Sequence, residues 1–329
     1  MAEMQHREAL RAAIREEMER DERVFCIGEE VGYYGGAYAV TRGLFQQFGA
    51  ERMVDTPISE ASYVGLGIGA AVAGLRPVVE LMYVDFFALA MDQIATQMPK
   101  LRYMTGGQLS VPMVLRTQGG TGRSAGSQHS QSLETWCVHV PGMHVVMPAT
   151  NADAKGLLKS AIRNPDPVVF IEHKALYARK EEVPEDDDYL VPLGKARVHR
   201  EGTDVTIVTY SRMLFYAEEA AEKLASDGIE AEVIDLRTLS PMDTETVAAS
   251  VRKTGRAVAL SEAHSTAGMA AEIAARISEA AFDALTAPVL RIAAKDVPVP
   301  ATHLEKVSIP SPEEIYERTR DLVKKGGTA

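Results

Sequence analysis

The sequence predicts an α/β protein of two domains, in which each domain is a mostly parallel sheet flanked by helices. A chain of 329 residues with 46% apolar residues can bury a large core, and its length suggests two domains. Short runs rich in valine and isoleucine alternate with amphipathic stretches, which is typical of parallel strands joined by helices. A dense charged run at 179–188 interrupts this alternation, as expected of a solvated connection. We therefore expect a first domain at 1–180, a charged linker at 181–200 and a second domain at 201–329.

The composition argues against several classes of function. A net charge of −11 disfavours nucleic acid, whose phosphates are neutralised by lysine and arginine, and also disfavours an anionic membrane surface. Cys26 and Cys137 are the two cysteines, so we expect no disulfide framework and a reducing compartment. The first residues read as a charged helix rather than a signal peptide, and no apolar run reaches the roughly 20 residues of a membrane span. A cytoplasmic protein is expected.

The elements of the first domain follow from apolar spacing and from capping residues. Thr41 is expected to cap a short helix that ends at Phe48, and Thr150 to cap a helix that ends at Arg163. In chain order, we predict a helix at 4–20, a strand at 23–27, the helix ending at Phe48, a strand ending at Val54, a helix after Ser59, a strand at 77–82, helical structure to Tyr103, strands at 111–117 and 143–147, the helix ending at Arg163 and a strand at 168–171.

The second half repeats the alternation of strands and helices. Strands are predicted at 205–209, 231–235, 257–261 and 289–292, and helices at 214–225, 241–253, 269–284 and 312–324. Ser240 and Ser311 are each followed by proline, a pairing typical of an N-cap and the first helical position. Glu262, His264 and a helix start at Gly268 could form an anion site, although an interface role is favoured.

The stretch 55–74 is the one around which the first domain is organised. Pro57 fixes its own backbone and keeps Thr56 extended, so a helix cannot begin before Ser59, which stands at the N-cap position. Glu60 then lies in the first turn of a helix that is entered from a strand end. In α/β sheets such strand-end crevices are where ligands bind.

Two alternative interpretations of this stretch compete with a ligand-binding role for Glu60. Glu60 could simply balance the helix dipole. Alternatively, Gly65-Leu-Gly67-Ile-Gly69-Ala70 contains the dinucleotide pattern Gly-x-Gly-x-x-Ala. That pattern needs its first glycine at the turn between strand and helix, whereas Gly65 falls about six residues after the cap. Glycine inside a helix costs roughly 1 kcal/mol relative to alanine, so we expect these glycines to let another helix or another chain approach closely.

A glycine-rich loop after the strand at 111–117 contains a second motif with an alternative explanation. Gly122-Arg-Ser124-Ala-Gly126 matches the nucleophile elbow of α/β hydrolases. The elbow needs a strand running directly into its first glycine and a helix directly after the serine, and neither is predicted here. His129, in the same loop, could be an ordinary solvated or capping histidine.

Several segments together resemble one family of enzymes. Asp55-Thr-Pro-Ile-Ser-Glu60 followed by a Gly/Ala-rich helix resembles the pyrimidine-binding segment of thiamine-diphosphate enzymes. More narrowly, it is similar to the beta subunit of the decarboxylating component of 2-oxo acid dehydrogenase complexes. The resemblance extends over nearly the whole chain, and its further segments are 28–31, 36–38, 128–134, 153–157 and 172–174. The second half resembles the C-terminal domain of transketolase-related proteins.

The resemblance implies a set of site residues. Glu60 is expected to hold a proton at the pyrimidine ring nitrogen, and His129 to act as a proton donor or oxyanion partner. For Met82 and Phe86 the alternative is ordinary core packing. The full set implied is Glu60 and His129 as catalytic residues, Glu29, Ile58, Glu60, Met82 and Phe86 as cofactor contacts, and Met113, Ala161, Asn164 and Asp166 around a monovalent cation such as K⁺.

The implied reaction is the oxidative decarboxylation of a 2-oxo acid, with transfer of the acyl group to the lipoyl group of an acyltransferase component. The loop 127–134 favours a pyruvate or acetoin type over a branched-chain type. A non-catalytic scaffolding subunit that has kept the fold is the rival from a different class.

One absence implies a partner. In the superfamily the diphosphate and its Mg²⁺ are held by Gly-Asp-Gly followed by an asparagine. The chain has no Gly-Asp-Gly, and its two asparagines are Asn151 and Asn164. We therefore expect an alpha subunit to supply these ligands in a two-alpha, two-beta heterotetramer.

Overall fold

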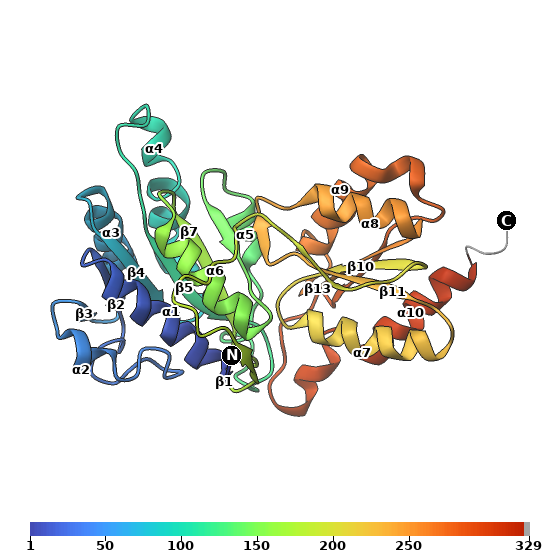
Figure 1. The fold of residues 1–329 in the computed structure, drawn as a ribbon, viewed down its shortest axis with the longest axis horizontal. Coiled ribbons are helices and arrows are strands. Elements are labelled where there is room, and N and C mark those ends of the chain that lie inside the picture. Colours follow the sequence, from blue (N-terminus) through green and yellow to red (C-terminus); the bar gives the residue numbers. More distant parts are fainter. Residues whose placement is uncertain (326–329) are drawn as a thin grey trace. The chain divides into compact units, whose positions relative to one another are not determined.

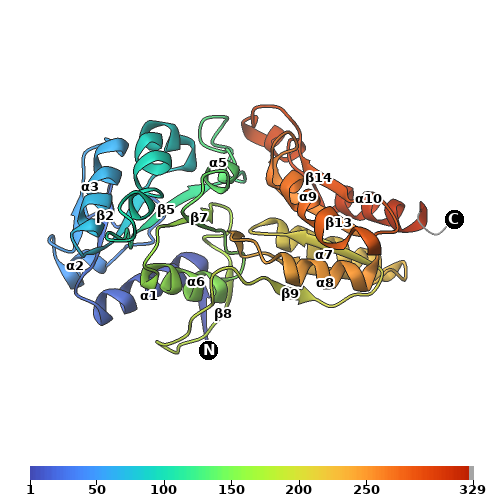
Figure 2. The ribbon, with the colours of Figure 1, turned by 90° about the horizontal axis from the view of Figure 1, so that it is seen from above.

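The computed structural model describes residues 1–325 and divides into two compact units (Figures 1 and 2). Unit 1 consists of Met1–Gly119 and Trp136–Leu193, and unit 2 consists of Gly120–Thr135 and the residues from Gly194 onward. The change from unit 1 to unit 2 after Leu193 falls inside the predicted linker. The segment Gly120–Thr135 differs from expectation, because the sequence places it in the first domain and the structure groups it with unit 2.

Parallel strands form the sheet of unit 1, in the order β3-β2-β4-β5-β7-β6. They are β2 (Val24–Gly28), β3 (Met53–Asp55), β4 (Arg76–Leu81), β5 (Val114–Gly119), β6 (His144–Val146) and β7 (Val168–His173). Each overlaps a predicted strand, and the predicted α/β class is confirmed. Because these strands are parallel, their carboxyl ends share one edge of the sheet.

Helices cover both faces of this sheet. α1 (His6–Arg20) and α6 (Asn151–Arg163) pack against each other, and their apolar residues form one core cluster with Val78 of β4. The next residue, Val79, meets α3 (Glu60–Val72), because successive side chains of a strand point to opposite faces. A Cβ added at Gly67 of α3 would lie 2.5 Å from Val79 Cγ2. The close approach predicted for the interior glycines is therefore to a strand.

The charged segment after unit 1's last core strand is more ordered than a solvated connection. β8 (Lys180–Val183) pairs antiparallel with β1 (Ala2–Gln5), so α1 starts later than predicted. The acidic residues that follow are exposed. The backbone of this segment is bound by α6, because Lys155 Nζ donates to the carbonyl of Pro184 at 3.0 Å. Lys155 is buried and pairs with Glu16 of α1 at 2.8 Å. The buried Lys155 side chain thus fixes a segment whose charged composition alone predicts a solvated connection.

Two connections of unit 1 differ from the predicted helices. α2 (Leu44–Phe48) begins after Gly43, so the predicted Thr41 cap is wrong: Thr41 is buried and its carbonyl accepts from Leu44 N at 3.1 Å. After β4 the predicted helix is replaced by three short pieces, the 3₁₀ helix η1 (Val84–Ala90), the π-helical turn η2 (Asp92–Gln97) and α4 (Leu101–Met104).

Unit 2 contains a second, mostly parallel sheet, in the order β14-β13-β10-β11-β9, with only β9 antiparallel to its neighbour. Its strands are β9 (Arg197–Arg200), β10 (Val205–Thr209), β11 (Ala231–Asp235), β13 (Ala257–His264) and β14 (Leu290–Ala294), and β12 (Thr238–Ser240) is a further short strand. Its helices are α7 (Met213–Ser226), α8 (Thr244–Thr254), α9 (Met269–Ala281) and α10 (Pro312–Lys325), with 3₁₀ turns η3 (Phe282–Ala284) and η4 (Thr302–Val307). None of the helices in residues 1–325 combines the length and apolar character required to cross a bilayer.

The two serine–proline caps predicted for unit 2 have different outcomes. Ser311 Oγ accepts from Glu314 N at 3.1 Å at the start of α10, as predicted. Ser240 does not cap α8, because the helix begins only at Thr244. Asp243 takes that role, and its carboxylate accepts from Thr246 N at 3.2 Å. Asp243, three residues after Ser240, was the overlooked signal.

Candidate active site

The carboxyl ends of three neighbouring strands carry the predicted cofactor contacts. Glu29 directly follows β2, Glu60 opens α3 after β3, and Met82 directly follows β4. Asp55, the last residue of β3, fixes the loop beyond β2, since its Oδ1 accepts from Gly32 N at 2.6 Å. The edge at which α/β sheets bind ligands therefore brings these residues together.

Two buried glutamates meet at this edge. Glu29 and Glu60 are each 8% exposed. Burial raises the pKa of Glu29, and the nearby charge of Glu60 raises it further, whereas a hydrogen bond from Tyr63 lowers it. The Tyr63 hydroxyl, one turn along α3 from Glu60, donates to Glu29 Oε1 at 3.2 Å. Glu29 and Glu60 thus form a buried acid cluster, in which the carboxyl group of Glu29 favours holding a proton.

Ile58 and Ser59 directly precede the buried Glu60 at the start of α3. Ser59 occupies the N-cap position, as predicted, but its hydroxyl pairs with the Ser62 hydroxyl at 2.7 Å and caps no backbone N–H. Ile58, just before the cap, is 81% exposed. A buried carboxyl and an exposed apolar side chain therefore stand two residues apart at the sheet edge.

A buried ionic network lies in the adjoining strands. Arg116 of β5 is 1% exposed and donates to Glu172 of β7 at 2.6 and 2.8 Å and to Glu80 of β4 at 2.7 Å. Gln118 Nε2 donates to the second oxygen of Glu80 at 2.9 Å, and Tyr177 donates to Glu172 at 2.6 Å. The charge of Glu80 also raises the pKa of Glu29. This network therefore contributes to the electrostatic environment of the acid cluster.

The same network fixes the turn that carries the predicted ring contacts. Tyr83 has a φ of 68°, a left-handed conformation that is unusual for a tyrosine, and its N–H donates to Gln118 Oε1 at 3.0 Å. Its ring packs edge-on against Phe86, with centroids 6.1 Å apart. Met82 and Phe86 are half-buried, so each keeps a surface beyond its own core packing.

His129 belongs to unit 2 rather than unit 1, and it lies in the loop 120–135. It is half-buried, and its N–H donates to the Gly126 carbonyl at 3.2 Å. Ser124 of the same loop is exposed, with no strand running into Gly122 and with the next helix, α5, beginning only at Glu134. The nucleophile elbow of a hydrolase is therefore not formed, as expected.

The residues implied for a monovalent cation lie around the ends of α6 and β7. The Met113 carbonyl accepts from Val168 N at 3.0 Å, and the Ala161 carbonyl accepts from Asn164 N at 3.2 Å. The side chain of Asn164 accepts from Asp166 N at 2.8 Å. The cation site stays a prediction. Throughout residues 1–325, no group of three or more histidine, cysteine, aspartate or glutamate side chains is arranged to hold a metal ion.

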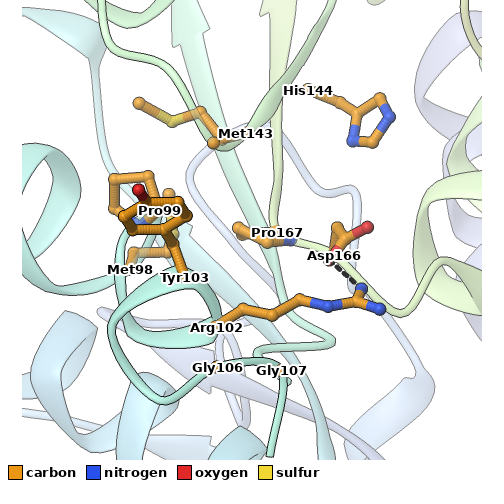
Figure 3. Close-up of a pocket in the computed structure, with 11 residues that line it drawn as sticks. Met98, Pro99, Arg102, Tyr103, Gly106, Gly107, Met143, His144, Asp166 and Pro167 are labelled. Atoms are coloured by element: carbon orange, nitrogen blue, oxygen red, sulfur yellow. Dashed lines mark hydrogen bonds and ion pairs between the residues drawn. The ribbon is translucent and has the colours of Figure 1, made fainter. Parts of the chain in front are cut away.

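A surface pocket of about 690 Å³ lies beside Asp166 (Figure 3). Arg102 crosses it and pairs with the Asp166 carboxylate, and Tyr103 projects beside Pro99. The pocket borders the first residues of β6 and β7, that is, the amino ends of the strands. It therefore belongs to the edge of the sheet opposite the acid cluster.

Several residues of the site could not be identified from the sequence reasoning. Tyr63 appeared only as part of a helix and Glu80 and Arg116 only as parts of strands, and Gln118 fell just beyond the predicted strand at 111–117. The available signal was a charged residue inside an apolar run, as at Glu80 and Arg116, because buried charges require partners.

Comparisons with known proteins match both halves of the chain. Residues 2–180 match the family model described as the pyrimidine binding domain of transketolase, and residues 194–315 match the transketolase C-terminal domain. The chain is 50% identical to the pyruvate dehydrogenase E1 component subunit beta of Rhizobium meliloti over 99% of its length and 71% of that protein. It is 49% identical to the mitochondrial pyruvate dehydrogenase E1 component subunit beta-1 of Arabidopsis thaliana, over 97% of the chain and 89% of that protein.

Solved structures support the fold. A split-gene transketolase, described as an inactive beta4 tetramer, matches with a TM-score of 0.77 at 23% identity and covers 97% of this chain and 98% of its own. A transketolase mutant from Pichia stipitis matches with a TM-score of 0.69 at 13% identity, over 99% of this chain and 46% of its own.

Proposed function

Because the chain belongs to the family of pyruvate dehydrogenase E1 component beta subunits, we propose that it catalyses the oxidative decarboxylation of pyruvate together with an alpha subunit. The observation that carries this proposal is the buried Glu60 at the start of α3, beside Glu29 and Tyr63 at the carboxyl edge of the sheet. A solvated, dipole-balancing glutamate would not need to be withdrawn from water in this way.

The residues at this edge fit the pyrimidine end of thiamine diphosphate. A planar heterocycle with ring nitrogens requires a proton-holding carboxyl group and apolar surfaces. Glu60 and Glu29 are the carboxyl groups, and Met82, Phe86 and Ile58 are half-buried or exposed apolar side chains near the same strand ends. An aromatic stacked on such a ring adds about 0.5–1.5 kcal/mol beyond burial of area.

The cofactor, when bound, supplies the nucleophilic carbon and the electron sink for decarboxylation. Glu60 holds a proton at the pyrimidine ring nitrogen and exchanges it as the reaction proceeds, and its burial excludes competing water. Glu29 adds a second acidic group, oriented by the Tyr63 hydroxyl. His129, on the loop 120–135, donates a proton to the substrate or stabilises its developing oxyanion.

The partners follow from what this chain does not contain. The alpha subunit supplies the ligands of the diphosphate and its Mg²⁺ in a two-alpha, two-beta assembly. The acyl group then passes to the lipoyl group of an acyltransferase component, and K⁺ is held near Met113, Ala161, Asn164 and Asp166. The protein acts in the cytoplasm.

Reconstitution tests this proposal. The chain is co-purified with a thiamine-dependent E1 alpha subunit, and turnover is followed by the reduction of an artificial electron acceptor. Pyruvate, acetoin and a branched-chain 2-oxo acid are compared, and each subunit alone is the control. We expect turnover only in the mixture and with pyruvate as the best substrate. Assembly without turnover on any of the substrates would support a scaffolding subunit and contradict the proposal.

A further inference from the structure

The loop 120–135 is attached to unit 2 by buried carboxylates. It leaves β5 after Gly119 and carries His129, and two of its carboxylate partners, Glu262 and Glu305, are 141 and 183 residues away from the backbone N–H groups that they bind. We propose that Glu305 is a positioning residue that fixes this loop and thereby sets the turnover of the reaction through His129. This inference rests on the proposed function.

The Glu305 carboxylate accepts hydrogen bonds from the backbone of this loop. It lies on η4, is 4% exposed, and its Oε1 accepts from Gly122 N at 2.8 Å while its Oε2 accepts from Ser124 N at 3.1 Å. Gly122 and Ser124 both have positive φ, at 101° and 54°. Backbone of this kind turns nearby N–H groups towards one point and makes an anion-binding concavity. Here the anion is the protein's own carboxylate.

Further contacts hold the loop on both sides of this grip. Thr121 N donates to Glu262 Oε1 at 2.7 Å, and Ser127 Oγ donates to the Val299 carbonyl at 2.8 Å. At the far end Glu134 accepts from the Tyr210 hydroxyl, which also pairs with Ser261 at 2.9 Å. His129 therefore stands between two anchored stretches of the loop.

The contacts are the main source of order in this part of the loop. Residues 122–125 and 127–128 are exposed, so they contribute little buried apolar surface to hold the backbone. Without Glu305, the N–H groups of Gly122 and Ser124 lose these two acceptors, and both residues are exposed to water. We therefore expect loss of Glu305 to release the loop locally, without unfolding unit 2.

Local release of the loop 120–135 is expected to lower kcat. Misplacing a catalytic group by about 1 Å can reduce a rate by about 10²-fold. The predicted pyrimidine contacts all belong to unit 1, whereas Glu305 belongs to unit 2. The expected signature is a lower kcat with an unchanged affinity for thiamine diphosphate.

The experiment uses the alpha–beta holoenzyme with Glu305→Ala, Glu305→Gln, His129→Ala and the double variant Glu305→Ala/His129→Ala. We expect Glu305→Ala to lower kcat by roughly 10- to 100-fold, with the dissociation constant of thiamine diphosphate changed less than twofold. Glu305→Gln keeps one acceptor oxygen and should fall in between, which also covers failure of the alanine variant to assemble. In the His129→Ala background the effect of Glu305→Ala should vanish.

Asp243→Asn is the matched control, since Asp243 is also a buried carboxylate of unit 2 that accepts two backbone N–H groups, from Ala196 at 3.1 Å and Thr246 at 3.2 Å. It should leave kcat within twofold. Amide hydrogen exchange of residues 120–130 should accelerate in Glu305→Ala and stay unchanged in Asp243→Asn.

Three results would overturn the inference. These are an unchanged kcat in Glu305→Ala, an equal loss in Asp243→Asn, or effects of Glu305→Ala and His129→Ala that simply multiply. A wild-type holoenzyme without any decarboxylase activity would instead contradict the proposed function, and the two failures are therefore distinguishable.

Discussion

The Tyr63 hydroxyl donates to Glu29 Oε1 across 3.2 Å and so connects the first turns of α3 to the end of β2. Burial raises the pKa of Tyr63, and the neighbouring glutamates raise it further, so the phenol remains a donor over the working pH range. For Glu29 the largest influence is burial, which raises the pKa of its carboxyl group. The two residues thus join a helix to a strand through a carboxyl group that favours its protonated form.

Glu29→Gln is expected to stabilise the protein increasingly as the pH rises. The folded-state pKa of Glu29 lies above the unfolded value of 4.5, so the folded state keeps a proton that the unfolded state releases. Stability from this group is present below pH 4.5 and is lost as the pH rises through the folded pKa. Thermal unfolding midpoints of variant and wild type, compared from pH 4 to 8, should diverge with increasing pH. A pH-independent difference would contradict the raised pKa.

Arg116→Met should destabilise unit 1 strongly. The change leaves Glu80 and Glu172 buried without their cationic partner, and breaking a buried pair in this way costs about 3–5 kcal/mol. Chemical unfolding of the holoenzyme measures the effect. Arg23→Met is the control, because Arg23 pairs with Asp21 at the surface and should matter much less. Equal effects for the two variants would show that the network is not important for stability.

Gly67→Ala and Gly69→Ala should have opposite effects. A methyl group at Gly67 would lie 2.5 Å from Val79 Cγ2, and such overpacking costs about 1–3 kcal/mol. A methyl group at Gly69 meets nothing within 4 Å, so the gain in helix propensity of up to about 1 kcal/mol is unopposed. Unfolding curves of the two variants check this contrast, and a stabilising Gly67→Ala would show that α3 does not press on β4.

His6→Asn should remove part of the acid sensitivity of unit 1. Burial lowers the pKa of His6 to about 4, although the hydrogen bond that His6 Nδ1 donates to Asn151 Oδ1 and the charge of Glu181 oppose this shift. The unfolded histidine binds a proton near pH 6.5, so wild-type stability falls as the pH drops from 6.5 to 4, by about 3 kcal/mol at 1.36 kcal/mol per pH unit. Unfolding free energies at pH 7 and pH 4.5 should differ less in the variant. The same difference in both proteins would refute the assignment.

Sequence periodicity was sufficient for the parallel sheets because their strands are nearly continuous apolar runs. The same reasoning placed Glu60 at a helix start after a strand end, where the structure has it. It also identified Thr150, whose side chain accepts from Asp153 N. These features depend on residues close together in the chain.

The failures share a physical cause, which is contact between distant residues. The pairing of β1 with β8 and the grip of Glu305 on Gly122 join segments about 180 residues apart, and no local pattern reports them. Ser240 and Thr41 were plausible caps by residue type, but the neighbouring Asp243 and Gly43 occupy the cap positions. An N-cap position depends on the residue at which packing lets a helix begin, and composition alone does not determine that residue.

The most direct measurement is the turnover of a holoenzyme carrying Glu60→Gln, with pyruvate as substrate and an artificial electron acceptor. Glutamine keeps the size of the side chain but cannot exchange a proton with the cofactor, and loss of such acid–base catalysis typically reduces a rate by about 10²–10⁴-fold. Glu51→Gln, at an exposed position before β3, is the control and should retain activity. Our account predicts that Glu60→Gln abolishes decarboxylation in an assembled heterotetramer. Wild-type turnover in Glu60→Gln would contradict it.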